Sequence, residues 1–171
     1  GPSSSTSSTW RSGWPVKPDI VMEGGNAAND TAGSVDTVVS LDLLTTNHQF
    51  LARPLQVFGD TSAATALAGR FAAQLFSQYP ALWPETVRAL MVHSAEWTQA
   101  MLDRFVGSDA WGATKTDVRN LMRHCGHGVP NMETAIWSVD NALTLVCQSE
   151  LQPFDEKFDV EGKRDGHCTK D

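Results

Sequence analysis

The sequence predicts an α/β domain with a largely parallel sheet, in which short strands alternate with amphipathic helices. Two observations carry this prediction. Short aliphatic and β-branched runs bounded by glycines, such as residues 20–22, are typical of buried strands. Longer segments, above all residues 62–78, repeat their apolar residues at intervals of three and four, which is the pattern of a buried helix face.

Length and composition are those of one globular domain. The 171 residues, 41% of them hydrophobic and 19% charged, suffice to build a sizeable core. The formal net charge of -7 disfavours a nucleic-acid or anionic-membrane partner. No apolar run approaches the roughly 20 residues that cross a bilayer. We therefore expect neither nucleic acid nor membrane as a partner.

The first third of the chain is predicted to alternate loops and strands. Residues 1–13 are rich in serine, threonine and glycine and lack the basic start and apolar centre of a signal peptide. Residues 20–22 predict a buried strand, and residues 26–34 predict a loop. Residues 38–46 predict a second strand, and residues 56–58 an extended lead-in to the first helix.

Helices are predicted for the middle of the chain. The first occupies residues 62–78 and has Pro80 just beyond its end. The second begins at Pro84, in the first-turn position that proline favours. The apolar stripe of the first helix consists of Ala64, Leu67, Ala68, Phe71, Ala72 and Leu75. That of the second helix consists of Val87, Leu90, Met91, Ser94 and Ala95.

The last third mixes weaker patterns. After a loop at 107–116, residues 117–124 predict a short helix, and Pro130 opens another helix whose apolar positions are Met132, Ala135 and Ile136. Residues 143–147 alternate in polarity as a half-buried strand does. From Pro153 onward no pattern is readable, and the tail at 161–171 is expected to be exposed.

Thr61 and Ser62 stand at the start of the first predicted helix. Unpaired backbone N–H groups and the positive end of the helix dipole converge there. This setting can stabilise an oxyanion beside a nucleophilic serine. Threonine and serine are also ordinary N-caps, so this stretch alone leaves capping and catalysis open.

The cysteines predict reduced thiols. Cys125, Cys147 and Cys168 are odd in number and lie far apart, which favours a reducing, cytoplasmic setting over a disulfide framework. His124, Cys125 and His127 lie close together, but adjacent ligands without a second cluster are weak evidence for zinc. We expect no metal and no other cofactor.

Three segments, taken in order, resemble the subtilisin-like serine proteases (subtilases). Val-Lys-Pro-Asp-Ile-Val at 16–21 is similar to a strand of that family, and Thr-Ser-Ala-Ala-Thr-Ala at 61–66 to its Gly-Thr-Ser-x-Ala-x-Pro nucleophile motif. Gly-His-Gly-Val-Pro at 126–130 resembles its Gly-x-Gly turn and closing helix. Residues 83–90, 92–98 and 143–154 are similar to bacterial members of a divergent branch.

The resemblance implies the C-terminal part of a subtilisin-like parallel-sheet domain at residues 1–138, followed by the beginning of a β extension or tail at 139–171. It implies that Ser62 is the nucleophile of a serine endopeptidase and that Thr61 and Ser62 form the backbone neighbourhood of the oxyanion. The substrate would be a polypeptide, and hydrolysis would pass through an acyl-enzyme.

The chain departs from the family pattern at two positions and lacks two catalytic groups. Asp60 replaces a glycine and Ala66 a proline. Aspartate tolerates unusual backbone angles better than most residues, but it adds negative charge beside a site for an anion. The family's catalytic aspartate and histidine precede the strand at 16–21, as does its oxyanion-hole asparagine, so the missing N-terminal part of the same catalytic domain would be a partner.

The histidines of this chain receive no triad role from the resemblance: they are His48, His93, His124, His127 and His167. His48, in a loop before Ser62, is the only formally attractive substitute. Many subtilases bind calcium, but no set of calcium ligands can be recognised in this sequence. Two other interpretations stay open: a catalytically inactive binding or scaffold module, and a truncated reading frame.

Overall fold

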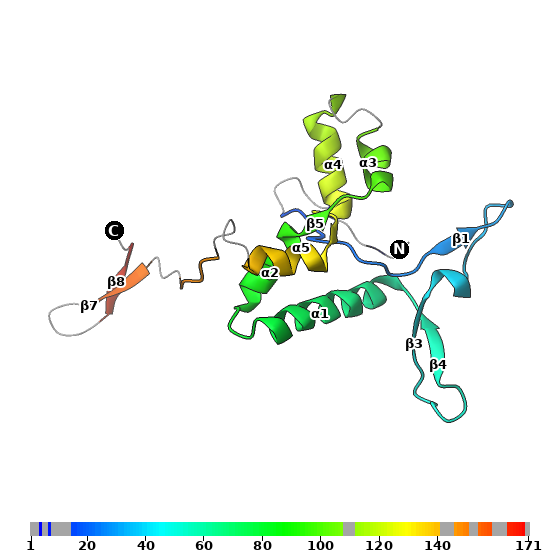
Figure 1. The fold of residues 1–171 in the computed structure, drawn as a ribbon. Helices are drawn as coiled ribbons and strands as arrows, with labels where there is room; N and C mark the ends of the chain where they lie inside the picture. Colours follow the sequence, from blue (N-terminus) through cyan, green and yellow to red (C-terminus); the bar gives the residue numbers. More distant parts are fainter. Residues whose placement is uncertain are drawn as a thin grey trace.

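Three helices build the hydrophobic core in the computed structural model (Figure 1), which describes residues 4, 7, 15–107, 112–140, 146–150, 154–158 and 164–169, the last two ranges as backbone. They are α1 (Asp60–Gln78), α2 (Pro84–His93) and α5 (Met132–Asp140). Their buried apolar side chains form one cluster, made of Phe71, Leu75, Val87, Leu90, Met91 and Ala135.

The two long predicted helices are confirmed. α1 starts two residues before the predicted position and ends at Gln78, as predicted. α2 carries Pro84 in its first turn. Its N-cap, Trp83, makes no side-chain cap hydrogen bond. The Gln148 side chain contacts the start of the helix in another way. Its Oε1 atom accepts from the Trp83 N–H at 2.6 Å and from the Thr86 hydroxyl at 2.7 Å.

A pair of shorter helices, α3 (Gln99–Phe105) and α4 (Lys115–Cys125), stands beside this core (Figure 1). α4 begins two residues earlier than predicted, because Thr114 and Asp117 form a capping box in front of it. The prediction missed α3, whose seven residues offer too few turns for a periodic signal. None of the helices in the described part of the chain combines the length and apolarity needed to span a bilayer.

The described strands pair only as antiparallel two-stranded sheets. The hairpins are β1–β2 (Ala27–Asn29, Val35–Thr37), β3–β4 (Leu43–Thr46, Leu55–Phe58) and β7–β8 (Phe154–Phe158, Arg164–Thr169), and β5 (Ala95–Glu96) pairs with β6 (Val129–Pro130). The predicted parallel sheet is therefore not confirmed within these residues. A parallel pair needs a crossover connection, whereas a hairpin returns the chain directly.

Several local predictions need correction. Residues 20–22 form no assigned strand, although the Val21 N–H donates to the Gly128 carbonyl at 2.9 Å. The predicted loop at 26–34 contains β1, and the predicted strand at 38–46 divides into a 3-10 helix, η2 (Val39–Leu41), and β3. β7 and β8 lie where no pattern was readable. The strand predicted at 143–147 falls mostly outside the described residues.

Candidate active site at the N-terminus of α1

Ser62 occupies the third position of α1 and is exposed to solvent. The N-cap is Gly59, so neither Thr61 nor Ser62 acts as the cap. The first four N–H groups of an α-helix have no partner within the helix, and the Ser62 N–H is among them. Ser62 thus presents a hydroxyl and a backbone donor together at the positive end of a 19-residue helix.

The backbone turns into α1 at Asp60. Its φ angle is +63°, and it is the single non-glycine residue with positive φ in the described part of the chain. Glycine reaches this left-handed region without steric cost, and aspartate does so more readily than most other residues. The conformation at position 60 explains why the related motif has glycine there and why aspartate can replace it.

Glycine residues lie close to the start of α1. A Cβ atom at Gly24, which is buried, would lie 2.6 Å from the Asp60 carbonyl oxygen. The Asp42 carboxylate lies beside two further glycines, since its Oδ1 would be 2.8 Å from a Cβ at Gly25 or at Gly59. This arrangement places a negative group near the positive end of the helix, which favours the helix.

The Gly-x-Gly turn at Gly126–Gly128 is hydrogen-bonded to the segment 16–21. The His127 N–H donates to the Asp19 carbonyl at 2.8 Å. Gly126 has φ +55° and would direct a Cβ into the carbonyls of Pro18 and Asp19. A side chain on Gly128, at φ +105°, would strike the carbonyl of Glu96. Both glycines are therefore required by close backbone approach as well as by φ.

Asp19 links this framework to α2. Its carboxylate forms ion pairs with Lys17 at 2.7 Å and Arg88 at 2.9 Å. Burial raises the pKa of Asp19, but the Lys17 hydrogen bond and the two positive charges outweigh it, so the net effect lowers the pKa. The segments 16–21, 83–90 and 126–130, far apart in sequence, thus meet in one framework behind α1.

No histidine is hydrogen-bonded to Ser62 within the described residues. His48 lies exposed in the loop at the far end of the β3–β4 hairpin, beyond the four residues of β3, which span about 13 Å at about 3.3 Å per residue. His93 ends α2. His124 bonds through Nδ1 to the Asn120 carbonyl at 2.7 Å. The His167 side chain lies outside the described residues.

The weak indication of a zinc site in the sequence also finds no support. His124, Cys125 and His127 form no metal-binding group, and the described residues contain no other set of three such side chains. Burial raises the pKa of the Cys125 thiol, against a smaller opposing effect of Arg104. A cavity of about 720 Å³ lies between α2 and residues 146–149, away from Ser62.

Sequence reasoning missed Asp42 and Gly24. Asp42 reaches the start of α1 because η2 ends at it, and no spacing in the sequence indicates that approach. The Gly24–Gly25 pair was a readable signal, but it was interpreted only as the end of a strand.

The comparisons with known proteins agree with this geometry. The family model of the subtilases matches residues 1–128, which include Ser62, the framework segments 16–21 and 83–90, and the first part of the segment 126–130. The chain belongs to the subtilase family. It is also 34% identical over 150 residues to a protein of Sinorhizobium fredii (strain NBRC 101917 / NGR234) described as "Uncharacterized protein y4bN". That alignment covers 84% of this chain and 32% of the relative. No solved structure matches the chain.

Proposed function

We propose that this subtilase chain is the nucleophile-bearing part of a serine endopeptidase, with Ser62 as the nucleophile. The observation that carries the proposal is the presentation of Ser62 at the N-terminus of α1. Ser62 is exposed to solvent, and its own N–H is among the first four of α1, which have no partner within the helix. The family match and the framework behind α1 support the same role.

The proposed reaction is acyl transfer. The Ser62 hydroxyl attacks the carbonyl carbon of a peptide bond, and a histidine outside this chain accepts its proton. The Ser62 N–H donates to the oxyanion of the tetrahedral intermediate. Its collapse releases the amine, which receives the proton from the histidine, and water then hydrolyses the acyl-enzyme. The preceding part of the same catalytic domain would provide the histidine and the aspartate.

A second candidate is a catalytically inactive subtilase module that binds polypeptides. Two carboxylates favour it: Asp60 occupies the glycine position and Asp42 lies beside Gly59 at the same helix end. Negative charge next to an oxyanion opposes the stabilisation that the helix end provides. This candidate predicts the same framework but no covalent chemistry at Ser62.

Labelling with a fluorophosphonate probe separates the two candidates. We expect the complete protein to be labelled at Ser62 and the Ser62→Ala variant not to be labelled. A folded complete protein that shows no Ser62-dependent labelling would exclude the endopeptidase. The 171-residue chain alone should not hydrolyse casein, because a serine without its base is a poor nucleophile. Hydrolysis that disappears in Ser62→Ala would contradict that expectation.

A further inference from the structure

Exposed apolar side chains are concentrated in one part of the described chain, between Val35 and Phe58. Leu51 is 91% exposed, Leu44 68% and Phe50 66%. The other large exposed apolar residues in this stretch are Val35, Val38, Val39, Leu41, Leu55 and Phe58. A contiguous exposed apolar surface on a folded protein marks a site of interaction.

The β3–β4 hairpin carries the most coherent apolar face. Leu44 pairs with Val57 and Thr46 with Leu55, so these four side chains share one face of the hairpin. We call it the hairpin face. Arg53 is the sole charged residue in the sequence from Leu43 to Phe58. Charge depletion of this kind is typical of the centre of an interface.

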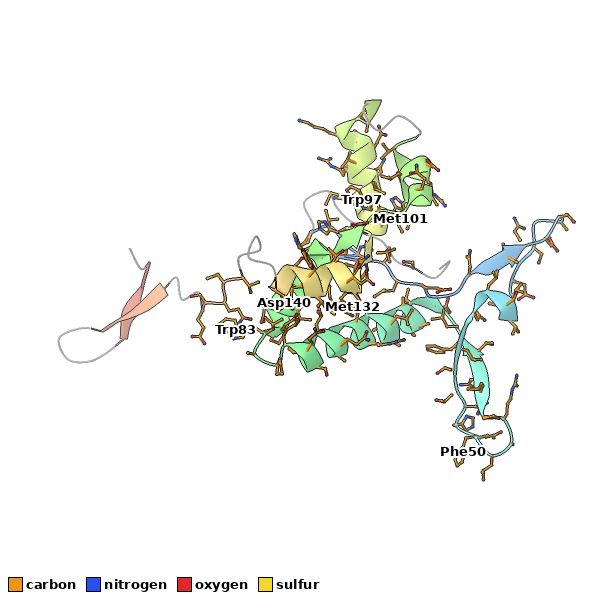
Figure 2. All side chains as sticks on the ribbon, in the orientation of Figure 1. Phe50, Trp83, Trp97, Met101, Met132 and Asp140 are labelled. Atoms are coloured by element: carbon orange, nitrogen blue, oxygen red, sulfur yellow. The ribbon has the colours of Figure 1, made fainter. Side chains whose placement is uncertain are left out.

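The hairpin also lacks the support that such an element normally needs. It extends away from the helices, and Phe50 lies near its far end (Figure 2). Its strands of four residues pair only with each other among the described strands. An isolated two-stranded hairpin is marginally stable in water and gains stability when a third strand or another layer packs on it.

The position of the hairpin identifies what would cover it. β4 runs through Gly59 directly into α1, so the base of the hairpin lies beside the helix end that presents Ser62. Any polypeptide that brings a histidine to the Ser62 hydroxyl must approach this same end. The chain spans only about a third of the length of its rhizobial relative, which leaves room for such a portion in proteins of this type.

We propose that the hairpin face is the docking surface for the polypeptide portion that carries the catalytic histidine and aspartate. The occupant is an apolar, extended segment of that portion, which packs on Leu44, Leu55 and Val57 and pairs with a free hairpin edge. This inference rests on the proposed function, because it takes the missing base as the reason for the contact. Docking here would order the hairpin and place the base beside Ser62 in one step.

Amide hydrogen exchange tests the contact. We compare residues 43–58 in the 171-residue chain and in the complete translation product of its reading frame. In the complete protein, exchange of the β3 and β4 amides should be slower by at least about tenfold. Leu44→Asp and Leu55→Asp should return it to the rate of the shorter chain. Val118→Asp, which places the same charge at an exposed apolar position on α4, should leave it unchanged.

Folding of the variants is checked in the shorter chain. Leu44 and Leu55 are exposed there, so their helical circular dichroism should equal that of the parent. Equal exchange rates in the two proteins would overturn the proposal, as would a reading frame without the catalytic portion. Concentration-dependent protection of the shorter chain, with a dimer in sedimentation, would overturn it in favour of a second copy as the occupant.

Fluorophosphonate labelling of the same samples separates this inference from the proposed function. Protection of the hairpin without Ser62 labelling would refute the endopeptidase and leave the docking surface standing. Labelling of Ser62 without protection of the hairpin would refute the docking surface alone. If both hold, Leu44→Asp and Leu55→Asp should lower the labelling rate at least about tenfold, because displacement of the base removes general base catalysis.

Discussion

Replacing Gly24 by alanine tests whether the segment before β1 holds the start of α1. The new Cβ would lie 2.6 Å from the Asp60 carbonyl oxygen and 3.2 Å from its carbonyl carbon. Both are backbone atoms of the first turn, so they cannot rotate away as a flexible side chain would. Gly24 is buried, and the only escape is a shift of one segment against the other.

The expected magnitude follows from overpacking. Extra methyl groups in close-packed sites cost about 1–3 kcal/mol of unfolding free energy. For a chain of this size, each kcal/mol lowers Tm by about 2–4 °C, so Tm should fall by about 2–12 °C. Because the displaced atoms belong to Asp60, the labelling rate of Ser62 in the complete protein should fall as well.

Gly69→Ala is the matched control. It adds the same methyl group to the middle of α1, where a Cβ meets no atom within 4 Å. Replacing a mid-helix glycine by alanine should raise stability by about 0.5–1 kcal/mol without changing Ser62. Thermal unfolding followed by circular dichroism measures both variants. If Gly24→Ala melts and labels like the parent, the contact between Gly24 and Asp60 does not hold the start of α1.

Three further predictions concern single side chains. Asp60→Ala should be less stable than Asp60→Gly by about 1–2 kcal/mol in urea unfolding, because both lose the carboxylate and only alanine is strained at positive φ; equal stabilities would contradict the left-handed turn. Because the pKa of Asp19 is lower in the folded chain than in the unfolded chain, its carboxylate stabilises the fold at pH values above the unfolded pKa, and this stabilisation disappears as the pH falls through the folded pKa. Asp19→Asn should therefore make Tm depend less on pH in the acid range. An unchanged dependence would show that the ion pairs contribute nothing. Iodoacetamide should modify exposed Cys147 faster than buried Cys125 in the native protein, as peptide mapping would reveal, and equal rates would contradict the burial of Cys125.

The helices of the core could be predicted because packing and periodicity coincide in them. The stripe on α1 runs from Ala64 to Leu75, about three turns at 3.6 residues per turn, and Phe71 and Leu75 on it are fully buried or nearly so. The β1–β2 hairpin could not be predicted for the opposite reason. Val35–Thr37 is exposed along its whole length, so no alternation between a buried and a solvated face marks it as a strand.

The candidate site was predictable where backbone conformation dictates the residue type. A glycine position occupied by aspartate indicated an unusual backbone angle, and Asp60 has one. Side chains that reach the site through the fold were not predictable. Asp42 is eighteen residues before Asp60 in the sequence, and only the path of η2 and the β3–β4 hairpin brings it beside Gly59.

The framework glycines are buried, whereas the two departures from the family motif, Asp60 and Ala66, are exposed. Gly24, Gly126 and Gly128 lie where backbones touch, so a substitution there would displace the framework. Asp60 and Ala66 lie on the exposed side of α1, and Ala66, seven residues into the helix, keeps a backbone N–H that proline would remove. Of the two departures, only Asp60 changes the charge around Ser62. The choice between peptidase and scaffold therefore depends on the chemistry at Ser62, and membership of the family alone does not decide it.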